Sequence, residues 1–140
     1  MSLEARLEEL GRSLGEREAA HAEALEVARA VARRLRDSVE SALERFHAGA
    51  AKAGADHLKI ELGPLRLDEK HVRAVEFDVT RGRHRAIFTV KSRGDVTLVG
   101  PFHKGKTEGP CRSFPIEAVD EIENALGDFL TRFLEEATSP

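Results

Sequence analysis

The residues Gly100–Thr107, GPFHKGKT, fit the pattern G-x-x-x-x-G-K-[ST], which occurs in loops that bind nucleotide phosphates. In such loops the glycines let backbone N–H groups surround the phosphates, and the lysine contacts them directly. The chemistry also needs a helix that begins at the Lys-Thr pair, because the N-terminal end of that helix faces the anion. Here Glu108, Gly109 and Pro110 follow at once, and this composition resists helix formation. We therefore predict that the match is spurious.

The residues around the match favour the same interpretation. After Thr107 we expect one helix and no further strand, so the parallel α/β core that normally carries a phosphate loop cannot be built. We predict no catalytic residue, no cofactor and a protein that is not an enzyme. Weak anion binding by Lys104 and Lys106 stays open beside the simplest interpretation, a cationic connection from Gly100 to Phe114. Because this is the longest predicted connection, it is the first place to look for function.

The cysteine and histidine content offers little for catalysis or metal binding. One cysteine, Cys111, excludes an internal disulfide framework and a Cys-rich zinc site. The neighbouring Arg112 could make this thiol reactive, but no base is placed beside it, and an incidental thiol is the preferred interpretation. No two of the six histidines are spaced by two to four residues, so we predict no metal site.

Basic residues cluster in one part of the chain. From Arg81 to Lys106 there are seven basic residues and one acidic residue, whereas the formal net charge of the whole chain is −3. A basic hairpin could contact nucleic-acid phosphates, and the opposing interpretation is neutralisation by the acidic C-terminal region or by a neighbouring subunit. The candidate residues for binding nucleic acid or another anion are Arg81, Arg83, Arg85, Arg93, Lys104 and Lys106.

Residues 1–53 are predicted to form one long helix. An apolar residue recurs at spacings of four, three and four, which indicates one stripe close to a coiled-coil seam. Gly11 and Gly15 weaken the helix, so a break at residues 11–15 is an open alternative, and Gly54 predicts the helix end. The stripe contains Leu3, Leu7, Leu10 and Leu14, and after Arg17 and His21 it continues through Ala24, Ala28, Val31 and Leu35.

The length of this helix predicts a homodimer. A helix of 52 residues is about 78 Å long, whereas a strand of six to eight residues spans only about 20–27 Å. One small sheet cannot cover the whole stripe, so the excess must pack on itself or on a second chain. No turn signal interrupts residues 16–53, and we therefore favour a second chain. The predicted dimer-interface residues are Leu7, Leu14, Ala28, Val31 and Leu35.

Residues 54–140 are predicted to complete the same single domain with a four-stranded antiparallel meander and a C-terminal helix. Alternating apolar residues flank a turn at Gly82-Arg83, and Val96–Val99 is expected to be the last strand. The helix, at residues 115–137, should cover the apolar face of the sheet. The predicted fold class is therefore α+β. The predicted cross-strand pairs are Val79–Ala86, Phe77–Phe88 and Val75–Val90.

These features lead to one expected function and one alternative. No apolar run approaches the roughly 18 residues that span a bilayer, and the start MSLEARLEEL does not resemble a signal peptide. We expect a cytoplasmic protein with no membrane partner. The expected function is a non-catalytic, homodimeric protein-interaction module with an unknown protein partner. The alternative is a nucleic-acid-binding protein that uses the hairpin 81–93.

Overall fold

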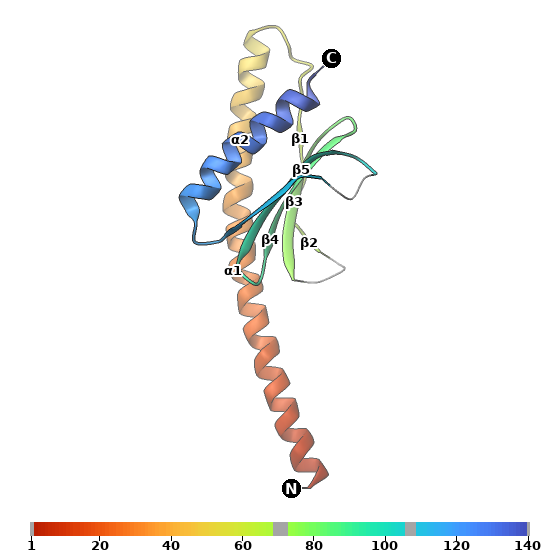
Figure 1. The fold of residues 1–140 in the computed structure, drawn as a ribbon, viewed down its shortest axis with the longest axis vertical. Helices are drawn as coiled ribbons and strands as arrows, with labels where there is room; N and C mark the ends of the chain where they lie inside the picture. Colours follow the sequence, from red (N-terminus) through yellow and green to blue (C-terminus); the bar gives the residue numbers. More distant parts are fainter. Residues whose placement is uncertain (1, 69–72, 106–108, 140) are drawn as a thin grey trace.

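The computed structural model describes residues 2–68, 73–105 and 109–139. Within these residues a 50-residue helix is followed by six strands and a second helix (Figure 1). The α+β class is confirmed, and the described residues contain six strands where four were predicted. The elements are α1 (Leu3–Lys52), β1 (Glu61–Leu62), β2 (Arg66–Leu67), β3 (Ala74–Arg81), β4 (His84–Lys91), β5 (Asp95–His103), β6 (Cys111–Pro115) and α2 (Val119–Ala137).

The strands form one antiparallel sheet in the order β1-β3-β4-β5-β6, and β2 also pairs with β3. Strands β3 and β4 are joined by a turn in which Gly82 has φ 57°, a conformation that favours glycine. The predicted register of this hairpin is confirmed. Period-two alternation places the paired apolar side chains on one face of the sheet, where all of them are buried. The pairs are Val79–Ala86, Phe77–Phe88 and Val75–Val90.

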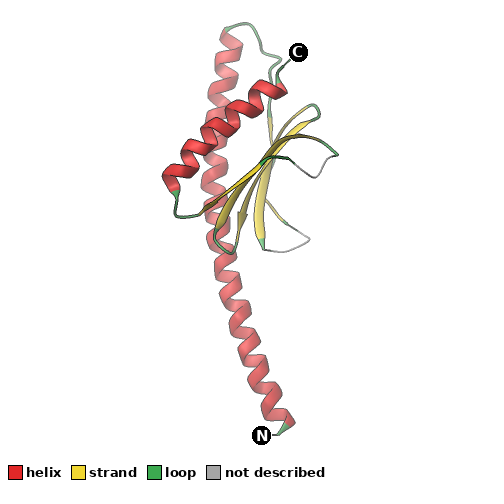
Figure 2. Cartoon of the chain, in the orientation of Figure 1, coloured by secondary structure: helices red, strands yellow, loops and turns green. Residues whose placement is uncertain are grey.

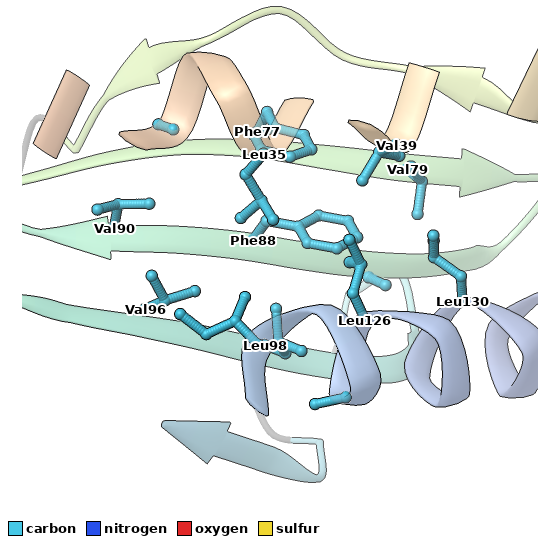
Figure 3. Close-up of a cluster of buried hydrophobic side chains, with 14 of the residues drawn as sticks. Leu35, Val39, Phe77, Val79, Phe88, Val90, Val96, Leu98, Leu126 and Leu130 are labelled. Atoms are coloured by element: carbon cyan, nitrogen blue, oxygen red, sulfur yellow. The ribbon is translucent and has the colours of Figure 1, made fainter. Parts of the chain in front are cut away.

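Both helices lie on this apolar face of the sheet (Figures 1 and 2). Helix α1 packs over β3 and β4, and α2 packs over β4 and β5. The ring of Phe88 stacks on Phe77 with centroids 4.7 Å apart and meets the edge of Phe129 in α2 at 5.3 Å. Side chains from α1, the sheet and α2 therefore share one core (Figure 3). The prediction that the C-terminal helix packs on the sheet is confirmed.

Helix α1 contributes much of this core, which corrects part of the predicted dimer interface. Ala28 is 0% exposed and Leu35 is 8% exposed, and both belong to the core cluster. Val31 is partly buried against the same cluster. Ala28 and Leu35 were predicted to contact a second chain, but they are buried within their own chain. The predicted contact of Val31 with a second chain stays a prediction. The small side chain of Ala28 lets the helix approach the sheet closely, so the sheet covers this part of the stripe.

Helix α1 is continuous from Leu3 to Lys52, so the break considered at residues 11–15 does not occur. The Oγ atom of Ser2 accepts a hydrogen bond from the backbone N–H of Ala5 at 3.1 Å and caps the helix. Near the other end, Gly54 has φ 83°, as expected for a glycine that terminates a helix. The predicted end of the helix is confirmed.

The C-terminal region differs from the prediction. Cys111–Pro115 forms strand β6, which pairs with β5, and α2 begins only at Val119. Strand β5 itself continues to His103. Val96–Val99 is therefore not the last strand, a strand does follow Thr107, and Pro115 ends a strand where it was expected to start a helix. Only Phe114 of β6 is buried, so this edge strand lacks the apolar alternation that identifies a strand in a sequence.

Candidate functional site

The phosphate-loop pattern begins inside a strand. Gly100 lies within β5, with φ 122°, and a Cβ atom at this position would lie 3.1 Å from Ala86 Cα. Glycine at position 100 is thus required by the packing of β5 on β4. Gly105 is in a turn, and Lys106 and Thr107 lie outside the described residues. The next described element is strand β6, so the structure shows no helix N-terminus directed at this segment.

Three of the four candidate arginines contact other groups of the protein. Arg81 donates a hydrogen bond from Nη1 to the Ala137 carbonyl oxygen, 2.7 Å away at the C-terminal end of α2. Arg85 donates from Nε to Asp78 Oδ2 at 2.8 Å on the uncovered face of the sheet. Arg93 donates from Nε to Asp95 Oδ2 at 2.5 Å. The predicted set therefore does not form one continuous cationic surface.

The two other described candidates, Arg83 and Lys104, lie close together at one end of the sheet. Arg83, at the tip of the β3–β4 turn, and Lys104, just after β5, are both exposed. The Lys104 backbone N–H donates to the Arg83 carbonyl oxygen at 2.7 Å. Beside them, the rings of His84 and His103 pack edge to face with centroids 4.9 Å apart. The sequence did not predict this histidine pair, since the two residues are brought together only by the β4–β5 register.

Nucleic-acid binding stays a prediction, and the structure reduces the number of candidate residues that are available to contact phosphates. Of the six candidates, Lys106 lies outside the described residues, and only Arg83 and Lys104 are exposed cations without a partner in the described part of the chain. With two phosphate contacts, the logarithm of the association constant for single-stranded DNA should fall with the logarithm of salt concentration with a slope of about −1.4. The double variant Arg83→Ala/Lys104→Ala should bind more weakly in a fluorescence-anisotropy titration with labelled single-stranded DNA. If unaltered protein gives no anisotropy change at low salt, the prediction fails.

The structure separates Cys111 from its neighbouring cation. Cys111 is exposed and lies opposite Val99 in the β5–β6 register. Adjacent residues of a strand point to opposite faces, so Arg112 is directed away from the thiol. The guanidinium of Arg112 lies 5.0 Å from the centroid of the Phe114 ring. The structure therefore does not provide the local activation of the thiol that was considered from the sequence.

The described part of the chain has neither a cluster of metal ligands nor a membrane-spanning helix. In residues 2–68, 73–105 and 109–139, no group of three or more His, Cys, Asp or Glu side chains is arranged to hold a metal ion. In the same residues, no helix is long and apolar enough to cross a membrane.

The N-terminal part of α1 is the most distinctive surface. It projects beyond the sheet (Figure 1), and every residue from Ser2 to Ala20 is exposed. We call residues 3–20 the arm. Leu7 and Leu14, two of the predicted interface residues, lie on it. The four leucines of the arm remain exposed by 66% at Leu3, 57% at Leu7, 51% at Leu10 and 44% at Leu14.

The arm has one apolar side and one polar side. Arg12 forms ion pairs with Glu9 and with Glu16, the latter at 2.7 Å. These three residues lie on the side of the helix opposite the leucines, and pairs at this spacing support a helix in water. Gly11 borders the leucine stripe, and a Cβ atom at this position would meet nothing within 4 Å. The contacts within the chain thus do not require this glycine.

The fold and the arm define an α+β protein with a projecting amphipathic helix. Comparison of the chain with protein-family models, with curated proteins and with solved structures found no match.

Proposed function

We propose that the protein is a non-catalytic, homodimeric interaction module whose arm binds the arm of a second copy. The observation that supports this proposal is the stripe of four exposed leucines at heptad spacing on a helix that extends past its own sheet. Two-stranded coiled coils bury this pattern. A second copy of the chain carries leucines at the same spacing, so the leucines of the two arms can pack against each other.

The leucines provide enough binding energy for a reversible dimer. Full burial of one leucine side chain is worth about 1.5–3 kcal/mol, so covering eight half-exposed leucines gives roughly 6–12 kcal/mol. The arm is already helical because it continues α1, and little ordering remains to be offset on association. Association also costs at least about 4 kcal/mol in lost translational and rotational freedom. The upper end of the range therefore leaves a net binding free energy of about −8 kcal/mol, which corresponds to a dissociation constant of about 1 μM. We expect a dimer that dissociates on dilution.

The experiment is a light-scattering mass measurement across a dilution series. We expect a mass near twice the 15.4 kDa of one chain at high concentration and a fall toward one chain below the dissociation constant. A mass of one chain at about 100 μM, where a 1 μM dimer is almost fully formed, would refute the proposal.

A further inference from the structure

We propose that the two arms pair antiparallel, with Leu3 beside Leu14 of the partner subunit and Leu7 beside the partner's Leu10. This inference rests on the proposed dimer and adds its geometry. An antiparallel pair holds the two sheet-bearing parts of the dimer at opposite ends, whereas a parallel pair would place them side by side.

The leucines of the arm and the buried residues of α1 lie on the same side of the helix. At 100° per residue, the mean directions of these two sets agree to within about 10°. The sheet packs on that side of α1, and it begins near His21, whose Nε2 atom lies 3.5 Å from Ser92 Oγ in the turn after β4. The buried residues that define the direction are Ala28, Ala32, Leu35, Val39 and Leu43.

A parallel partner would collide with the sheet. Paired helices have axes about 8–10 Å apart, and a sheet lies at about the same distance from an element packed on it. A second helix that follows the stripe from Leu3 toward His21 would therefore enter the space that the sheet occupies. The second α1 cannot turn aside, because it is one continuous helix from Leu3 to Lys52.

An antiparallel partner avoids this collision. In the proposed register every leucine of one arm meets a leucine of the other, because residue numbers facing each other add to 17. The helix of the partner begins at its Leu3, beside Leu14, and runs away from the sheet. The distance along the helices between His21 and the partner's His21 is then about 38 Å.

Arg17 supplies an independent reason for this direction. It occupies the stripe position that follows Leu14. In a parallel pair Arg17 would face Arg17 of the partner subunit inside the seam, where two like charges oppose association. In the antiparallel register it lies beyond the last leucine layer, in water.

Electron–electron distances between spin labels test the orientation. In a Cys111→Ser background, one variant carries Ala20→Cys and a matched variant carries Glu8→Cys, both at exposed positions outside the seam. We expect a label distance of about 35–45 Å at position 20, because the two sites are about 35 Å apart along the helices. At position 8, where the sites are only about 2 Å apart along the helices, we expect a distance below about 30 Å.

Other combinations of label distances would contradict the orientation of the arms, the surface on which they pair or the dimer itself. Short distances at both positions would mean a parallel pair, so the orientation would be wrong while the dimer stood. A long distance at position 8 with a short one at position 20 would place the arm against the partner's groove between α1 and α2, which measures about 440 Å³ and includes Val31 and Val119. If neither variant showed dipolar coupling at about 100 μM, well above the expected dissociation constant, the dimer itself would fail.

Discussion

The double variant Leu7→Asp/Leu10→Asp should be a monomer at every accessible concentration. In the proposed dimer these substitutions place four carboxylates in an apolar seam without partners, and each such group costs several kcal/mol. A total loss of only about 4 kcal/mol would already raise the dissociation constant roughly 1,000-fold. We expect light scattering to give the mass of one chain, 15.4 kDa, where the unaltered protein gives twice that value.

A matched control separates the loss of the seam from the added charge. Ala5→Asp/Ala19→Asp introduces the same two charges at exposed positions on the opposite side of the arm, so it should remain a dimer. The leucines of the arm lie outside the hydrophobic core, and the leucine variant should therefore unfold at the same temperature as dilute unaltered protein. A dimeric leucine variant, or a monomeric control, would contradict the proposed seam.

The sequence predicted the parts of the fold that have strong local patterns. The β3–β4 register followed from alternating apolar residues on both sides of Gly82, because a shift by one residue would expose every one of these side chains. The predicted lengths of the helix and the strands also showed that the sheet cannot cover the whole of α1. The arm is the part of α1 that the sheet leaves uncovered. The position at which the sheet stops covering α1 could not be predicted, since Ala28 and Leu35 continue the leucine spacing of the arm without interruption.

Edge strands and side-chain contacts were harder to predict. Strand β6 pairs on one side only and buries a single side chain, Phe114, so its residues carry no periodic signal. The candidate arginines could be identified as a cluster, but their partners could not, because a charge count does not show that Arg93 pairs with Asp95 or that Arg85 pairs with Asp78 across the hairpin. Arg81 contacts Ala137 in α2, and this contact depends on where α2 ends on the sheet. Charge counts along a sequence therefore indicate a cationic region without showing which of its members are available to a ligand.

The substitution Phe88→Ala should cause a large loss of stability. Phe88 is 0% exposed, stacks on Phe77 and contacts Phe129 of α2, so its removal leaves a cavity at the centre of the core. We expect the free energy of unfolding in urea to fall by about 3–5 kcal/mol. Phe129→Ala, at a partly buried position at the edge of the same core, is the matched control and should cost less. Equal losses would contradict the more central position of Phe88 in this core.

The pair Phe77 and Phe88 also tests whether the core is one cooperative unit. Their rings stack at 4.7 Å with planes 7° apart, and aromatic pairs of this kind contribute about 0.5–1.5 kcal/mol beyond burial. In a double-mutant cycle of Phe77→Ala and Phe88→Ala, the free energy of unfolding lost by the double variant should therefore differ from the sum of the losses of the two single variants.

Unfolding of the core should also abolish the dimer. Because α1 carries both core residues and the arm, loss of the core should remove the rigid helix on which the dimer depends. The mass of the Phe88→Ala variant can be measured by light scattering across its urea transition. We expect the dimer to dissociate at the urea concentrations at which the core unfolds. A dimer that persists after the core has unfolded would show that the arm folds and pairs independently of the core.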